Sequence, residues 1–129
     1  MPRVPLRRTA LAATMAGLLL APAAPAAASA NACTHHLSGP QICIRLDGRN
    51  GWNSITAIWT NPPERLTRRE VTLYRDGERL ATATAKRSGK TLRHTWPTMN
   101  TGTDTELCVA FKGSRRLACE HTRYVGPRA

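Results

Sequence analysis

The sequence predicts a small all-β protein, a single antiparallel sandwich of seven strands braced by two disulfides. Three observations indicate this fold. Apolar and polar residues alternate in short runs, turn residues separate these runs at roughly eight- to twelve-residue spacing, and the chain contains four cysteines. Helical periodicity is nearly absent from residue 41 onward, so the class is all-β rather than mixed.

Residues 1–30 predict a secretory signal peptide. A basic start that includes Arg7 and Arg8 precedes an apolar run over 10–21, and small residues follow up to Ala30. This is the order that a signal peptidase requires, and the arginine pair leaves twin-arginine export open. The run is short and followed by prolines, so we expect no transmembrane segment in the mature protein. We expect that protein outside a bacterial cell, in the medium or at the cell wall.

The remaining chain is long enough for one domain. Cleavage is expected after Ala30, with Ala32 as the next choice. The mature chain then divides into an N-terminal segment (31–40), the β-sandwich domain (41–124) and a fraying tail (125–129).

The first two strands follow from strict alternation. In the run 42–46 the two isoleucines and the leucine occupy alternate positions, and Asp-Gly at 47–48 ends it. In the run 55–60 Ile, Ala and Trp alternate with Thr, Ile and Thr before Asn-Pro-Pro. Because alternate side chains point to opposite faces of a strand, each run has one face for the core, and Trp59 belongs to it.

The third and fourth strands form the clearest hairpin. Asp76-Gly77 separates the third run from the fourth, which ends near Ala85. Asp-Gly between two β-rich runs is typical of a two-residue hairpin turn. This turn would pair Leu73 with Leu80.

The last three strands follow two further turns. The segment 86–90 predicts a basic turn before the fifth strand, 91–96, which Pro97 stops. The final hairpin joins 106–112 to 115–122 through a Gly-Ser turn.

An even number of cysteines in a small exported chain predicts disulfides rather than free thiols or metal ligands. Spacing favours Cys33–Cys43 and Cys108–Cys119, although other pairings stay open. The final hairpin places Cys108 opposite Cys119. A strict two-residue loop makes this a hydrogen-bonded pair, which a disulfide fits less easily, so a four-residue loop is the alternative.

The run 55–62 resembles the second strand of fibronectin type III domains, where an inward Trp is followed by a turn containing Pro. Tyr74 is similar to the core Tyr of the next strand in that family, and 102–113 resembles its later loop, sixth strand and turn. The likeness extends over 55–122. It implies an immunoglobulin-like sandwich, a fold that hosts adhesion, binding and inhibition alike and so leaves the function open.

Groups that could carry chemistry are few. His35 and His36 follow Cys33, but no second ligand pair follows at a zinc-type spacing. The serines lack a nucleophile-elbow pattern, and Asp104 with Glu106 is typical of solvated surface. We therefore expect no catalytic residues, no metal and no cofactor.

The charge gives the more specific hypothesis. The chain has 19 Lys and Arg against 8 Asp and Glu, and its leader carries three of the basic residues, so the mature charge is 11 − 3 = +8. Basic loops attract polyanions such as acidic cell-surface polymers, whereas export makes nucleic acid an unexpected partner. Ordinary solubility is the alternative explanation of the charge. The candidate binding residues are Lys86, Arg87, Lys90, Lys112, Arg115 and Arg116.

We expect a secreted, non-catalytic binding module that engages an anionic cell-surface polymer or a partner protein. The alternative is a small inhibitor of an extracellular hydrolase, which presents the loop 113–116 on its disulfide brace. Trp52, beside Asn50, is expected near the surface, where its ring could stack on a sugar.

Overall fold

The computed structural model describes residues 28–35 and 39–124, and all the regular structure in them is β. Every strand pair is antiparallel. The all-β antiparallel prediction is confirmed, but the predicted number of strands is wrong because an additional one precedes the first predicted run. The strands are β1 (Ala28–Cys33), β2 (Gln41–Arg49), β3 (Trp52–Thr60), β4 (Arg68–Arg75), β5 (Glu78–Ser88), β6 (Thr91–Asn100), β7 (Glu106–Phe111) and β8 (Ala118–His121).

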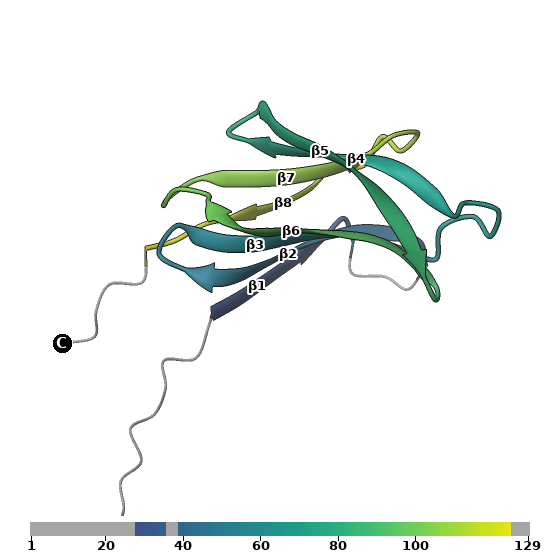
Figure 1. The fold of residues 1–129 in the computed structure, drawn as a ribbon, viewed down its shortest axis with the longest axis horizontal. Helices are drawn as coiled ribbons and strands as arrows, with labels where there is room; N and C mark the ends of the chain where they lie inside the picture. The colour runs from purple at the N-terminus through teal and green to yellow at the C-terminus, as the bar shows by residue number, and fades with distance from the viewer. Residues whose placement is uncertain (1–27, 36–38, 125–129) are drawn as a thin grey trace, which may run out of the picture.

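The strands form one continuous sheet in the order β1-β2-β3-β6-β5-β4-β7-β8. The sheet curls until its two ends approach each other, and β8 lies against β1 and β2 (Figure 1). Within the described residues no hydrogen-bonded ladder joins β8 to β1. The protein is therefore a nearly closed barrel, where the sequence predicts two separate sheets.

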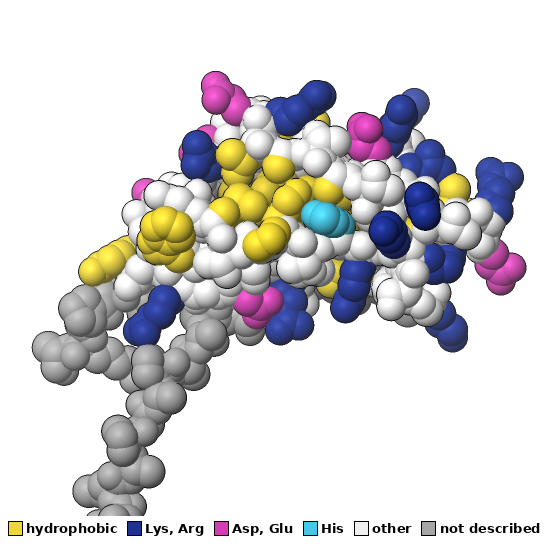
Figure 2. Space-filling model, in the orientation of Figure 1, with side chains coloured by type: hydrophobic (Ala, Val, Ile, Leu, Met, Phe, Trp, Pro, Cys, Tyr) yellow, Lys and Arg dark blue, Asp and Glu magenta, His cyan; other side chains and the backbone are white. Residues whose placement is uncertain are grey.

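The shortest strand pairing in the sheet joins β5 to β6. These strands pair over three positions only, 86–88 with 91–93, and then separate (Figure 1). The separation divides the sheet into two halves, β1-β2-β3-β6 and β5-β4-β7-β8. Figure 2 shows hydrophobic side chains at the surface along this opening.

The turn between β4 and β5 takes the conformation that its sequence predicts. Asp76 and Gly77 have φ angles of 48° and 82°, as a type I′ turn requires. The predicted pairing of Leu73 with Leu80 is wrong, because a β-bulge beside Leu73 shifts the register and pairs Leu73 with Ala81. Leu80 is the extra residue of β5 at this bulge, and its side chain is exposed.

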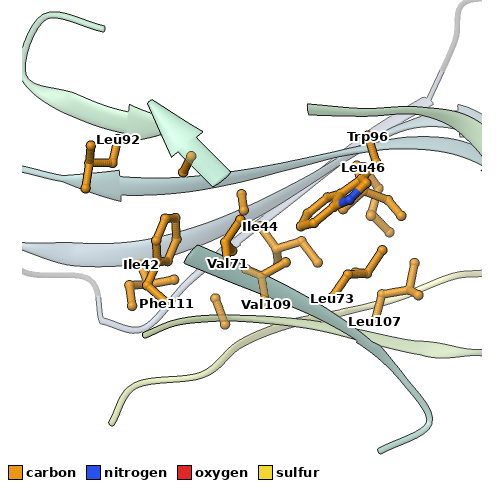
Figure 3. Packing of buried hydrophobic residues seen from close by; sticks show 14 residues of the cluster. Ile42, Ile44, Leu46, Val71, Leu73, Leu92, Trp96, Leu107, Val109 and Phe111 are labelled. Carbon is orange, nitrogen blue, oxygen red and sulfur yellow. The ribbon is translucent and has the colours of Figure 1, made fainter. Parts of the chain in front are cut away.

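The core lies between the two halves and takes apolar side chains from both (Figure 3). The alternation predicted for the first two runs is confirmed, since their inward isoleucine, leucine and alanine residues are buried. Trp59 is only partly buried, but its ring packs on Phe111 with ring centroids 5.6 Å apart. Tyr74, which the resemblance places in the core, is partly buried and lies outside the core cluster. The buried cluster consists of Ile42, Ile44, Leu46, Ile55, Ala57, Val71, Leu73, Ala85, Leu92, Trp96, Leu107, Val109, Phe111 and Ala118.

Both predicted disulfides are confirmed. Cys33–Cys43 joins β1 to β2, and Cys108–Cys119 joins β7 to β8, each between directly opposed residues. The register around the last hairpin is as predicted, but the paired strands stop earlier. The connecting loop therefore spans 112–117, and both shorter loops considered from the sequence are wrong.

The predicted cleavage position lies inside a strand. Ala30 belongs to β1 and pairs with Leu46 of β2. Cleavage there would remove the first half of β1 and keep the half that carries Cys33. The rest of the predicted leader, 1–27, and the predicted tail, 125–129, lie outside the described residues. The described residues contain no helix that could cross a membrane.

Replacing Phe111 by Ala should lower the free energy of unfolding by about 3–5 kcal/mol, because the side chain fills the space between the halves and is 1% exposed. Urea unfolding of the oxidised protein measures the loss. Leu117→Ala, in the adjoining loop and 51% exposed, is the control and should change stability by less than about 0.5 kcal/mol. Similar small losses in both variants would contradict this packing.

Candidate functional site

The antiparallel connections bring the loops together at two ends of the barrel. At one end lie the residues before β2, the β3–β4 loop, the β5–β6 turn and the β7–β8 loop. The Arg116 Nη1 donates to the Pro40 carbonyl oxygen at 3.0 Å, which links the last of these loops to the first. The basic end comprises residues 39–41, 60–70, 86–93 and 111–118, and the opposite end comprises 47–53, 74–79, 99–107 and 119–124.

Most of the positive charge lies at the basic end. Figure 2 shows Lys and Arg side chains gathered on the right, where Figure 1 places the β3–β4 loop and the β5–β6 turn. The acidic residues there are Glu64 and Glu70, and all other acidic residues lie at the opposite end. The basic residues of the basic end are Arg65, Arg68, Arg69, Lys86, Arg87, Lys90, Arg93, Lys112, Arg115 and Arg116.

Three of these cations form a row across three adjacent strands. Arg68 of β4 stands directly opposite Lys86 of β5, which stands directly opposite Arg93 of β6. Directly opposed residues share a face, with Cβ atoms about 4.5–5.5 Å apart. All three side chains are exposed, and none forms an ion pair within the described part of the chain. We call these three residues the cation row.

The sequence prediction placed Lys86 and Arg87 in a turn, which is wrong. Both belong to β5, and the turn consists of Gly89 and Lys90. Because alternate residues of a strand face opposite sides, Lys86 is exposed while Arg87 is partly buried.

The Arg87 guanidinium is hydrogen-bonded to backbone carbonyl oxygens of the protein, so it is not available to a ligand. Its Nε donates to the Leu66 carbonyl oxygen at 2.8 Å and its Nη2 to the Pro63 carbonyl oxygen at 2.7 Å. A longer contact joins Nη1 to the Gly89 carbonyl oxygen at 3.4 Å. Arg87 therefore holds the β3–β4 loop against β5. The loop and turn enclose a hollow of about 370 Å³, whose walls include Arg87 and Lys90.

The remaining predicted residues lie in the β7–β8 loop. Arg116 is tied to the segment before β2, so it also supports the structure. Lys112 and Arg115 are exposed, and among the described residues their side chains have no hydrogen-bond or ion-pair partner. Together with Lys90 they flank the basic end as available charges.

Arg68 and Arg93 are binding candidates that the selection of loop residues missed. A signal for Arg93 was present, because a two-residue turn centred on Gly89 and Lys90 sets it opposite Lys86. No comparable signal exists for Arg68, since the β-bulge next to Leu73 decides the pairing on that side.

Of the groups considered for metal binding, His36 lies outside the described residues. His121 Nε2 lies 3.2 Å from Asp104 Oδ1, and both side chains are exposed. The cluster with metal-ligand geometry consists of Glu106, Cys108 and Cys119. Its two sulfurs share a disulfide and offer no thiolate.

No protein family model, curated protein or solved structure matches this chain.

Replacing Arg87 by Gln should destabilise the protein by about 1–3 kcal/mol, because carbonyl groups of the β3–β4 loop lose a charged donor. Amide exchange at Leu66, whose N–H bonds to the Pro63 carbonyl oxygen, should accelerate at the same time. Lys112→Gln is the control for loss of one charge and should leave both measurements unchanged. If amide exchange at Leu66 is unaltered in the Arg87 variant, Arg87 does not hold the β3–β4 loop against β5.

Burial lowers the pKa of His94 below its usual 6.5. The imidazole stands edge-on to the Trp96 ring, with ring centroids 4.7 Å apart. As the pH falls through 6.5 the unfolded chain takes up this proton before the folded protein does. The stability linked to His94 is therefore fully present above pH 6.5 and is lost as the pH falls from there toward the lower folded pKa.

Thermal unfolding should reveal this linkage. The melting temperature of the wild-type protein should fall between about pH 7.5 and pH 5, and His94→Gln should show a smaller fall because Gln does not titrate. Identical pH profiles for the two proteins would contradict the linkage.

Proposed function

We propose that the protein is a non-catalytic extracellular binding module that holds an anionic polymer on the cation row and the loops beside it. The observation that carries this proposal is the direct opposition of Arg68, Lys86 and Arg93 across three strands. Like charges at directly opposed positions destabilise a sheet, so the row costs folding stability when nothing is bound. A bound anion would relieve that repulsion.

The geometry of the row favours a polymer over a single small anion. Neighbouring strands lie about 4.7–4.9 Å apart, so the three charges extend along a line of roughly 10 Å. Lys90 in the adjoining turn and Lys112 and Arg115 in the β7–β8 loop continue the positive surface. A chain with regularly repeated negative groups can neutralise several of these cations at once, which is the source of steeply salt-dependent affinity.

An extracellular setting is part of the proposal. Two disulfides are compatible with an oxidising compartment, and the predicted leader directs export. Acidic polymers of the bacterial surface are therefore the partners that the proposal names, and nucleic acid is not.

We also propose the fibronectin type III-like arrangement as the closest description of the topology. If β2 to β8 are lettered A, B, C, C′, E, F and G, the order is A-B-E in one half and C′-C-F-G in the other. The same sandwich pattern is found in adhesion and binding domains, which agrees with a non-catalytic role.

Inhibition of an extracellular hydrolase remains the second candidate, on one observation. Leu117 is 51% exposed in a loop that the Cys108–Cys119 bridge and the Arg116 hydrogen bond hold in place. A rigid loop with an exposed apolar side chain binds with little ordering cost. Such contacts would weaken little in high salt.

The Lys86→Gln variant tests the proposal with inorganic polyphosphate and polygalacturonate as probes. Affinity at about 0.1 M salt should fall several-fold, and the slope of log K against log salt should decrease by about one. The free energy of unfolding should stay level or rise by about 0.2–1 kcal/mol, because the middle charge of the row is gone.

Arg79→Gln is the matched control, since Arg79 is an exposed cation on the same strand but outside the row. It should leave affinity and salt slope unchanged. Wild-type polyphosphate affinity in the Lys86 variant, or polyphosphate binding that persists in 1 M salt, would overturn the proposal. Salt-resistant protein binding lost in Leu117→Ala would favour the inhibitor.

A further inference from the structure

A hollow of about 280 Å³ lies at the opposite end of the barrel, where the sheet fails to close. It is bounded by β1 and the β2–β3 hairpin on one side and by the end of β8 on the other. Leu46 supplies apolar wall that the predicted cleavage after Ala30 leaves in place, Asn53 supplies an amide, and Arg49 and Arg123 supply cations. Its size suits one six-membered ring, since pockets for larger ligands measure about 300–1,000 Å³.

One wall of the hollow is rigid before any ligand arrives. Asn53 is buried, and its Nδ2 donates to the Thr101 Oγ1 at 2.9 Å. The Thr101 hydroxyl in turn donates to the Gly51 carbonyl oxygen at 3.0 Å. Gly48 lets β2 and β3 approach closely in this wall, because a Cβ there would clash with the Trp52 carbonyl oxygen and lie 2.9 Å from the Asn53 Oδ1. The wall is therefore preorganised for binding.

The two arginines at the rim have no acidic partner in the part of the chain that the structure describes. Arg49 and Arg123 are both exposed, and within the described residues neither forms an ion pair or a side-chain hydrogen bond. A guanidinium matches a carboxylate with two parallel hydrogen bonds. The rim can therefore accept an acidic group of a ligand, while Glu120 in the lining offers an acceptor to hydroxyl groups.

Exposed aromatic residues adjoin the two arginines that line this hollow. Trp52 is 57% exposed and stands directly opposite Arg49 in the β2–β3 pair, and Tyr124 is 63% exposed and directly follows Arg123. Hydrophobic side chains project at the left of Figure 2, where Figure 1 places the β2–β3 turn and the chain after β8. The energetic cost of exposing such rings is explained if they stack on an apolar ligand face.

We propose that this hollow is a second binding site, which takes one acidic sugar residue. The sugar ring stacks on the exposed aromatics, its carboxylate pairs with Arg49 and Arg123, and its hydroxyl groups bond to Glu120. This combination requires a ligand that has an apolar ring face, hydroxyl groups and a negative charge together, which a uronic acid provides. The site does not depend on the cation row, which lies at the other end of the barrel.

The test is a titration of the ¹⁵N-labelled secreted protein with trigalacturonate, and with uncharged galactotriose as the matched sugar. Trigalacturonate should shift the Trp52 indole N–H and the Gly48 amide signals, and galactotriose should bind at least about fivefold more weakly. Trp52→Ala and Arg123→Gln should each weaken trigalacturonate binding by about fivefold or more. Trp52→Phe, which keeps a stacking ring, should retain most of the affinity.

Matched controls separate this site from the proposed polymer site. Arg115→Gln and Lys86→Gln remove charges at the basic end and should leave the Trp52 shifts unchanged. Unperturbed Trp52 and Gly48 signals at saturating trigalacturonate would overturn the proposal, even if basic-end signals moved. Equal affinity for galactotriose would overturn the assignment of an acidic sugar.

Discussion

Burial of one apolar face between the two halves of a curled sheet is the interaction on which the rest of this structure depends. Each strand has a side-chain period of two, so the face that enters the core determines what the other face shows to solvent. Ala85 and Leu92 are fully buried, and their neighbours Lys86 and Arg93 must therefore point outward. The outward cations are a geometric consequence of the inward packing.

This arrangement sets stability against surface charge. A small domain has little stability to spare, and three like charges at opposed positions reduce it further. The fold compensates elsewhere, since each disulfide contributes about 2–4 kcal/mol. Both bridges join strands at the edges of the sheet, β1 to β2 and β7 to β8, where no further strand of residues 28–35 and 39–124 adds hydrogen bonds. The cross-links thus support the two places where the sheet is least supported by pairing.

The two ends of the barrel present different chemistry because antiparallel connections alternate between them. The basic end collects long cations on exposed turns and strand positions, with Arg87 and Arg116 bonded to backbone carbonyl oxygens that shape the loops. The opposite end holds most of the carboxylates, the unclosed part of the sheet and the exposed rings of Trp52 and Tyr124. For this reason we propose a polyanion as the ligand of the first end and a single acidic sugar as the ligand of the second.

The sequence by itself determined the antiparallel β class, the inward residues of the first strands and the hairpin turn at Asp76-Gly77, and it favoured the disulfide pairing that the structure has. These features follow from local period, turn chemistry and cysteine spacing. Only the tertiary structure decided that the sheet would curl into one nearly closed barrel and that β1 would join it. It also decided the cation row: the bulge beside Leu73 shifts β4 by one residue and sets Arg68 opposite Lys86. A bulge inserts one residue into a ladder in response to twist and packing across strands, which no single run of sequence encodes.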